Sequence, residues 1–292
     1  MSNAALPPNS SGASNASAAS AASPVAAPSG AVASEPGQQA TRYRVEQGAA
    51  WITLNRPENR NALSAVLVNE LAAHFDAAQA DPQARCIVIT GNGPAFCAGA
   101  DLKNPPGSAT EGKTSVSLAE ILARMQDSPK PVIIAVNGAA FAGGLGLVGA
   151  GDIVIAVQDA PFSFSEVRIG VIPAVISVVC APKLGTHHAM KLFITGERFS
   201  GEQAVAFGLA HRAVPADQLR AAVQEEIDMI RAGGPIAVAE CKRLVRRVQQ
   251  LPRDEGFEEM SVWSRKMFVS PEGQEGMAAF REKRKPSWMQ GD

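Results

Sequence analysis

Two glycine-rich turns are the parts of this sequence best suited to hold a ligand by its oxygen atoms. The first is Phe96-Cys-Ala-Gly-Ala-Asp101 and the second runs from Asn137 to Gly146, each after a run of apolar residues. Small residues let backbone amides face a ligand without intervening side chains. An amide in a turn and an amide at a helix N-terminus can together bind an oxygen that develops negative charge. The pair predicts an oxyanion hole, although two ordinary tight turns would have the same composition.

Glu166 is the carboxylate of most interest, because apolar residues flank it. Phe162, Phe164 and Val167 flank it, and Ile169-Gly-Val-Ile-Pro173 follows. Because apolar surroundings disfavour the charged form of an acid, they raise its pKa and allow proton exchange near neutrality. Glu166 is therefore a candidate general acid or base. The alternative is a surface glutamate paired with Arg168.

A further pattern in the second turn, Gly144-x-Gly146-x-x-Gly149, matches the dinucleotide-binding fingerprint. In that fingerprint the glycines follow the strand directly, whereas residues 137–143 intervene here. The acidic residue that the fingerprint needs about 20 residues later should end a strand, whereas Glu166, at roughly that distance, lies in the mixed run Ser163-Phe-Ser-Glu-Val-Arg168. A nicotinamide enzyme is therefore the less favoured interpretation.

Buried strands and amphipathic helices must position these turns. Continuous apolar or β-branched runs predict strands, since a sheet covered on both faces produces them, at Arg42–Glu46, Ala50–Leu54, Cys86–Thr90, Val132–Val136 and Ile153–Val157. Ser64 is the expected N-cap of a helix that Asp81-Pro82 ends. Strands alternating with helices indicate the α/β class.

The chain divides by composition into three parts. In residues 1–40, 30 residues are Ala, Ser, Pro or Gly, which predicts a disordered tail. Residues 41–199 carry the predicted strands and form the expected core. Residues 200–292 form a helical region that begins with a Ser200/Gln203 capping box and a Gly208 stop, with later helices at 217–231, 235–250, 254–268 and 272–283.

Charge and cysteine usage exclude several classes of protein. The 27 basic and 28 acidic residues give a net charge of −1, which argues against a nucleic-acid binder. Residues 131–151 carry no charge, but their glycines favour a buried strand, turn and helix start over a membrane span. The four cysteines lack zinc spacing and the histidines form no metal motif, so no metal is expected. The tail lacks the features of a secretory or mitochondrial leader, so the cytoplasm is the expected location.

Several segments together resemble the enoyl-CoA hydratase/isomerase (crotonase) superfamily. The match covers about residues 41–288 in the family's order and spacing. It rests on Asn61-Ala-Leu-Ser64, Ala95-Phe-Cys-Ala-Gly-Ala-Asp-Leu-Lys103, Asn137-Gly-x-Ala-x-x-Gly-Gly144, Ser165-Glu-Val-Arg-Ile-Gly-Val-Ile-Pro173, Thr195-Gly-Glu-Arg-Phe199, Ala206-Phe-Gly-Leu209 and Glu275-Gly-x-x-Ala-Phe-x-Glu-Lys-Arg284.

This resemblance implies a spiral of ββα units, a helical C-terminal trimerisation region and an acyl-CoA thioester substrate. By position, the amides of Ala98 and Gly143 would hold the thioester carbonyl, and Glu166 would move protons. Coenzyme A enters as part of the substrate, so no separate cofactor is expected. The resemblance assigns substrate binding to Arg60, Ala62, Leu63, Gly99, Asp101, Leu102, Gly144, Pro173, Phe280 and Lys283. Of these, Phe280 and Lys283 would reach coenzyme A across a subunit boundary in a homotrimer or a dimer of trimers.

One departure from the family pattern concerns the reaction type. Hydratases of this family use two glutamates, and Gly146 stands where the first belongs. A lone Glu166 suits a 3-enoyl to 2-enoyl isomerase. However, the run from Ser165 to Ser177 resembles the bacterial methylglutaconyl-CoA hydratase-like branch, which also lacks the first glutamate. We therefore expect a hydratase of short or branched 2-enoyl-CoA, with the isomerase as alternative and a non-catalytic CoA-binding homologue as a third interpretation.

Overall fold

The computed structural model describes residues 39–101 and 116–289. Its main sheet has the strand order β1-β2-β3-β5-β7-β9. Strands β1 and β2 are antiparallel, and every later neighbour is parallel. The strands span Thr41–Glu46, Ala49–Leu54, Cys86–Gly91, Val132–Val136, Ile153–Val157 and Arg212–Val214. The mixed α/β class predicted from the sequence is confirmed.

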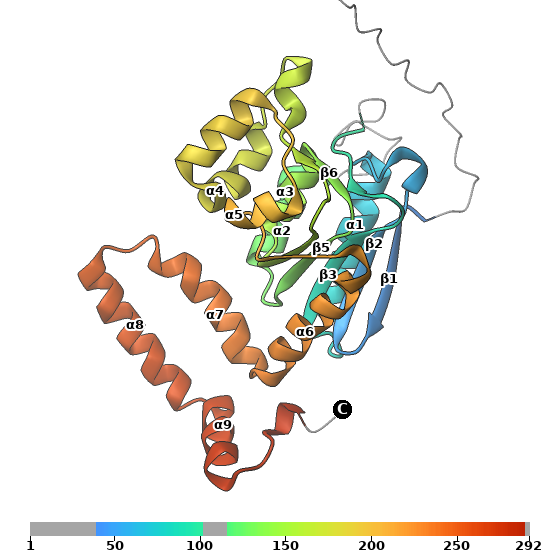
Figure 1. Cartoon of the computed structure of the whole chain (residues 1–292). Coiled ribbons are helices and arrows are strands. Elements are labelled where there is room, and N and C mark those ends of the chain that lie inside the picture. The colour runs from blue at the N-terminus through green and yellow to red at the C-terminus, as the bar shows by residue number, and fades with distance from the viewer. Residues whose placement is uncertain (1–38, 102–115, 290–292) are drawn as a thin grey trace, which may run out of the picture. The chain divides into compact units, whose positions relative to one another are not determined.

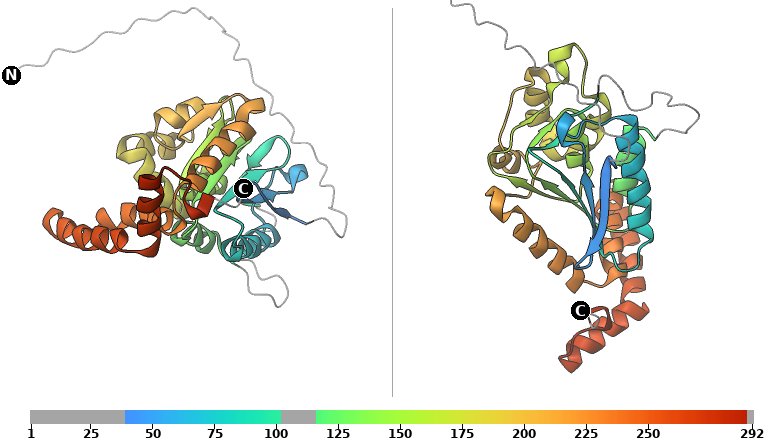
Figure 2. Two further views of the ribbon diagram at one scale, coloured as in Figure 1. Left: turned by 90° about the horizontal axis from the view of Figure 1, so that it is seen from below. Right: turned by 90° about the vertical axis from the view of Figure 1, so that its right-hand side faces the viewer.

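Helices cover both faces of this sheet, which explains the continuous apolar character of β3 and β5. Figure 2 (right) shows α1, Ala65–Ala80, on one face and α6, Leu219–Ala232, on the other. Helix α1 contacts β1, β2 and β3, and α6 contacts β5 and β7. As predicted, the Ser64 side chain caps α1 by accepting the Leu67 N–H.

A second, smaller sheet pairs β4, β6 and β8 in parallel. These strands span Ala95–Cys97, Ala139–Phe141 and Phe162–Ser163, and none of them is among the strands that the sequence predicts. Two or three residues are too few to produce a recognisable alternating pattern. The uncharged stretch at 131–151 forms β5, β6 and the buried helix α3, Gly143–Ala150. None of the described helices is long and apolar enough to cross a membrane.

Two helices before residue 200, α2 and α4, are also absent from the sequence prediction. Helix α2, Leu118–Asp127, begins with a capping box between Ser117 and Glu120. Helix α4, Ala174–Thr195, starts with β-branched residues and contains Pro182 and a non-helical Gly185, features that weaken a helical pattern.

The chain beyond residue 200 is largely helical, as predicted, with one exception. Strand β9 adds an edge strand to the main sheet through β7, and its three residues give no strand signal. Helices α5, α7, α8 and α9 span Gly201–Ala206, Pro235–Val248, Arg253–Phe268 and Pro271–Glu282. Figure 1 shows α7 and α8 to the lower left of the sheet and α9 below it. Short 3-10 turns lie at Pro57–Asn59, Ser165–Ile169, Ala216–Gln218 and Ser287–Met289.

The expected tail at 1–40 lies outside the described residues except for its last two positions. Those two positions already contact the body of the protein. The Gln39 carbonyl accepts a bond from the Asn55 side chain, and the Ala40 carbonyl accepts the Asn55 N–H at 2.7 Å.

Candidate active site

The three strands of the small sheet lead to the two predicted turns and to the candidate carboxylate at one edge. Because β4, β6 and β8 are parallel, their carboxyl ends meet at the same edge. Strand β4 leads into residues 98–101, β6 leads into Ala142 and Gly143, and β8 leads through Phe164 to Glu166. The two glycine-rich turns and the candidate carboxylate therefore lie at a common edge, although they are far apart in the sequence.

The two turns are in direct contact. Gly99 has a φ of +94°, and a Cβ placed on it would lie 2.8 Å from the Ala142 Cβ and 3.4 Å from the Gly143 nitrogen. A Cβ on Gly143 would lie 3.0 Å from a Leu63 methyl group and 3.7 Å from the Ala100 nitrogen. Glycine is therefore required at 99 both for its backbone conformation and for this approach.

The structure corrects the choice of amide in the first turn. The Ala98 N–H, predicted to face the ligand, donates to the Arg60 carbonyl at 3.0 Å and is already paired. The backbone of Leu63 forms hydrogen bonds with both neighbours of Ala100. The Leu63 N–H donates to the Gly99 carbonyl at 2.7 Å, and the Leu63 carbonyl accepts the Asp101 N–H at 3.2 Å. Ala100 lies between these bonds, and its own amide finds no acceptor among the described residues.

The second amide comes from the start of a helix, as predicted. Gly143 is the first residue of α3, where the backbone N–H has no acceptor within the helix. Ala142 precedes it with φ 46° and ψ −121°, a region sparsely populated by residues with a side chain. The Ala142 N–H donates to the Ser163 carbonyl at 3.0 Å, which ties this strained turn to β8. The pair of amides suited to an oxyanion is therefore that of Ala100 and Gly143.

Glu166 has the environment predicted for a proton-transfer group. Its side chain is half-buried, and Oε2 is buried without a hydrogen-bond partner among the described residues. Burial is the main cause that raises the pKa of Glu166 above its ordinary value. Glu166 forms no ion pair with the exposed Arg168 in the described structure, so the alternative of a surface pair is wrong.

The space beside Gly146 is apolar. A Cβ on Gly146 would lie 2.6 Å from the Ile176 Cγ2 and 3.2 Å from a Leu122 methyl group. Similar contacts surround the other glycines of the fingerprint, because a Cβ on Gly144 would meet the Cys97 carbonyl and one on Gly149 would meet the Cys180 sulfur, each at 2.6 Å. Close packing of α3 therefore accounts for the fingerprint without a dinucleotide.

Two buried cysteines lie near this edge, and neither is a thiolate. Cys97 and Cys180 are buried, and burial raises the pKa of each thiol to about 12, which keeps both protonated at neutral pH. No group of three His, Cys, Asp or Glu side chains suited to a metal ion occurs within residues 39–101 and 116–289.

Asn61 is a positioning residue that sequence reasoning did not single out, although it belongs to the Asn61-Ala-Leu-Ser64 motif. It is fully buried, and its side chain makes three hydrogen bonds. Its Oδ1 accepts the Arg56 N–H at 2.8 Å, and its Nδ2 donates to the carbonyls of Asn92 and Ala95 at 3.0 and 2.9 Å. Arg60 and Asn61 both have a φ of +56°, so this network holds a strained turn whose Arg60 carbonyl engages Ala98.

The predicted binding residues divide into two groups. Those from 60 to 101, with Gly144 and Pro173, lie on segments that adjoin the edge described above. Leu102 lies outside the described residues. Phe280 and Lys283 lie at the end of α9, which packs against α7 and α8, and Figure 1 shows α9 far from β6. Phe280 is 87% exposed. Within a single chain, Phe280 and Lys283 therefore lie away from the candidate site.

Comparison with known proteins finds sequences that are similar over most of this chain. A family model described as enoyl-CoA hydratase/isomerase matches residues 44–291. The chain is 35% identical over 243 residues to enoyl-CoA hydratase EchA19 of Mycobacterium tuberculosis, covering 81% of this chain and 91% of the relative. It is 35% identical over 244 residues to carnitinyl-CoA dehydratase of Proteus mirabilis, covering 81% and 93%.

Solved structures show the same fold. Pseudomonas aeruginosa AtuE superposes with a TM-score of 0.79 at 32% identity, covering 86% of this chain and 100% of that one. An enoyl-CoA hydratase from Shewanella pealeana gives a TM-score of 0.78 at 32% identity, covering 85% and 96%.

Replacing Asn61 with alanine should destabilise the protein strongly. The change leaves the Arg56 N–H and two buried carbonyls without their partner, and an unpaired buried polar group costs about 1–3 kcal/mol. We expect Asn61→Ala to lower the free energy of unfolding in urea by about 3 kcal/mol. Asn59→Ala, on the same loop, removes only one bond at 3.2 Å and should cost less than about 1 kcal/mol. Equal losses would contradict the assignment.

Replacing Glu166 with glutamine should stabilise the protein in a pH-dependent way. Because the folded chain raises the pKa of this carboxyl above 4.5, its ionised form lowers stability at pH values above the folded pKa. That penalty diminishes as the pH falls toward 4.5 and is lost below it, where the carboxyl is protonated in both states. We expect Glu166→Gln to melt at a higher temperature than the parent at pH 8, with a smaller difference at pH 5. The exposed Glu202→Gln variant should not show this trend.

Proposed function

Because the chain belongs to the enoyl-CoA hydratase/isomerase family, we propose that it is a hydro-lyase that adds water to, or removes it from, a short or branched 2-enoyl-CoA. The observation that carries the proposal is the half-buried carboxyl of Glu166, whose Oε2 has no hydrogen-bond partner among the described residues, at the edge that also holds the Ala100 and Gly143 amides. The enzyme class agrees with relatives named enoyl-CoA hydratase and carnitinyl-CoA dehydratase.

In this proposal the amides act on the thioester oxygen. The N–H groups of Ala100 and Gly143 donate to the carbonyl oxygen, which gains negative charge as water adds at C3 and an enolate forms. One preorganised donor of this kind contributes about 10²–10³ in rate. The close packing of the two turns keeps both donors in place before the substrate arrives, so no reorganisation is needed during the reaction.

Glu166 performs both proton transfers in this proposal. Its carboxylate takes a proton from water while the hydroxyl oxygen bonds to C3. The resulting carboxylic acid then returns that proton to C2 of the enolate, so no proton is gained or lost. A raised pKa favours this role because the acid and its conjugate base must both be accessible. Amides and one carboxyl supply all the chemistry, so the proposal needs no cofactor besides the coenzyme A of the substrate.

For coenzyme A we propose a channel lined by the loop before α1 and the first turn. Its expected lining residues are Arg60, Ala62, Leu63, Gly99, Asp101 and Leu102, with Gly144 and Pro173 at the acyl end. We propose that Phe280 and Lys283 of a second copy complete it in a homotrimer or a dimer of trimers. Exposure of Phe280, Phe257 and Phe268 on α8 and α9 supports such an assembly.

We further propose that the substrate resembles that of the methylglutaconyl-CoA hydratase-like branch. The support is the run from Ser165 to Ser177, which includes Glu166 and the start of α4. The four free cysteines, three of them buried, fit a cytoplasmic protein.

An isomerase that moves a double bond from C3 to C2 is the second candidate. It is favoured by the apolar wall of Ile176 and Leu122, which occupies the space beside Gly146 where a second glutamate would have to fit. In that reaction Glu166 alone removes a proton from C2 and returns it at C4. A non-catalytic CoA-binding homologue is the third candidate, and it predicts binding without turnover.

Replacing Glu166 with glutamine should abolish most of the activity, because the amide can neither accept nor release the proton. We expect turnover of crotonyl-CoA and 3-methylglutaconyl-CoA, followed by loss of enoyl absorbance, to fall by about 10²–10⁴. Glu202→Gln provides the matched control and should keep parental activity. Full activity in Glu166→Gln would show that the catalytic assignment is wrong, and a parent protein that binds enoyl-CoA without turning it over would favour the non-catalytic candidate.

Two substrates that differ in the position of the double bond should distinguish hydration from isomerisation. In deuterated water we expect 2-hexenoyl-CoA to give 3-hydroxyhexanoyl-CoA with one deuterium at C2, and 3-hexenoyl-CoA to remain unconverted. Mass spectrometry of both products provides the measurement. Conversion of 3-hexenoyl-CoA to 2-hexenoyl-CoA without a 3-hydroxy product would instead support the isomerase.

A further inference from the structure

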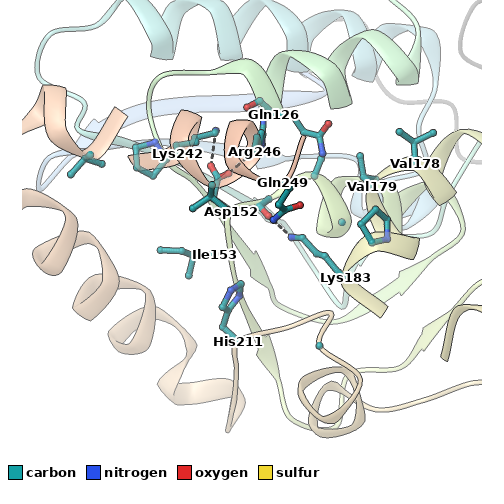
Figure 3. A pocket seen from close by; sticks show the side chains of 18 of the residues that line it. Gln126, Asp152, Ile153, Val178, Val179, Lys183, His211, Lys242, Arg246 and Gln249 are labelled. Carbon is teal, nitrogen blue, oxygen red and sulfur yellow. Dashed lines mark hydrogen bonds and ion pairs between the residues drawn. The ribbon is translucent and has the colours of Figure 1, made fainter. Parts of the chain in front are cut away.

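A cavity separate from the candidate active site lies at the C-terminal end of α3, opposite the end that begins with Gly143. It has a volume of about 540 Å³, within the range of about 300–1,000 Å³ typical of small-molecule sites. The C-terminal end of α3, the middle of α4 and one face of α7 line it, together with His211 next to β9. Figure 3 shows side chains from these elements converging on it.

Positive charge is in excess around this cavity. Lys183, Lys242 and Arg246 line it, whereas Asp152 is its only acidic lining residue among the described residues. Asp152 accepts from the Lys242 ammonium at 2.6 Å, and its second oxygen lies 3.6 Å from Arg246. Arg246 also lies 3.9 Å from the exposed Asp127 and donates to the Gln126 carbonyl. Asp152 is thus paired with two cations, and its charge also acts on Lys183, which itself forms no ion pair within the described part of the chain.

The side chains of Lys183 and His211 each keep at least one N–H group that donates no hydrogen bond within the described residues. The Lys183 ammonium is largely buried and donates one hydrogen bond, to the carbonyl of Gly151, which leaves further N–H groups. The His211 Nδ1 accepts the Val154 N–H at 3.0 Å, so the neutral ring carries its proton on Nε2. Burial is the first cause that lowers the pKa of His211, and the charge of Lys183 is the second. Figure 3 shows both side chains directed into the cavity.

The remaining wall is apolar. Ile153, Val178, Val179, Val238 and Val245 contribute side chains, and Val178 and Val245 are more than half exposed, which leaves the cavity open to solvent. A largely buried ammonium that forms no direct ion pair, and that shares the charge of Asp152 with two other cations, carries a desolvation cost that an anionic ligand would offset. An apolar wall beside such a cation fits a ligand that has an anionic head and a hydrocarbon body.

We propose that this cavity binds a small carboxylate with an apolar body, with the carboxylate on the Lys183 ammonium and the His211 Nε2–H and the hydrocarbon against the valines. The site does not depend on the function proposed above, because it uses neither Glu166 nor the amides of Ala100 and Gly143. Its proposed occupant is a free acid without coenzyme A.

Calorimetric titration of the full-length protein with sodium hexanoate tests the proposal. We expect saturable binding with a Kd below about 1 mM, weakened at least tenfold in Lys183→Met and largely kept in Lys183→Arg. Lys191→Met is the matched control, because Lys191 lies on the same helix but is exposed and paired with Glu197. It should bind hexanoate as the parent does, and thermal melting should confirm that all three variants are folded.

Four further titrations distinguish this cavity from a general anion site and from the proposed coenzyme A channel. Hexan-1-ol should not bind, because it lacks the charge, and inorganic phosphate should bind more weakly than hexanoate, because it lacks the apolar body. Binding should persist in saturating coenzyme A and in Glu166→Gln. Equal binding of phosphate, displacement of hexanoate by coenzyme A, or undiminished binding in Lys183→Met would each overturn the proposal.

Discussion

Gly99 and Ala142 approach so closely that a Cβ on Gly99 would lie 2.8 Å from the Ala142 Cβ, and this contact sets the geometry of everything around it. It places the Ala100 amide beside the Gly143 amide. The approach is possible because β4 and β6 are adjacent parallel strands, so their carboxyl ends lie next to each other. Strand β8 extends the same sheet and brings Glu166 to that edge. A three-stranded sheet of very short strands thus assembles the proposed catalytic groups.

Several features of the edge that holds these groups raise the free energy of the folded chain, and the packing around the edge compensates for that cost. Among the described residues, Glu166 has a buried oxygen without a partner, Ala142 has a strained backbone, and two amides lack acceptors. Each of these features costs free energy in the unliganded chain. Fully buried strands such as β5 and the saturated hydrogen bonds of Asn61 surround the edge and hold it in place. A bound thioester would satisfy the amides, which is the usual reason for such a site to be retained.

Helix α3 connects the two ligand sites inferred from this structure. Its first residue supplies the Gly143 amide, and the carbonyl of its C-cap residue, Gly151, accepts from Lys183. The helix has only eight residues and is buried throughout, and three of its glycines are in contact with Cys97, Ile176 and Cys180. Such tight packing leaves little freedom for one end of the helix to move without the other.

The sequence determined the α/β class, the buried strands at 132–136 and 153–157, and the Ser64 and Ser200 caps. It also singled out the two turns and Glu166 as candidates for a site. These features depend on local composition and periodicity, which a single chain displays directly. The sequence did not reveal the three-stranded sheet, the edge strand β9 or the hydrogen bonds of Asn61, because these features depend on partners that are distant in the sequence. Only the tertiary structure decided between Ala98 and Ala100. Amides two residues apart in a turn have the same local chemistry, and the position of the Arg60 carbonyl determines which of them is already paired.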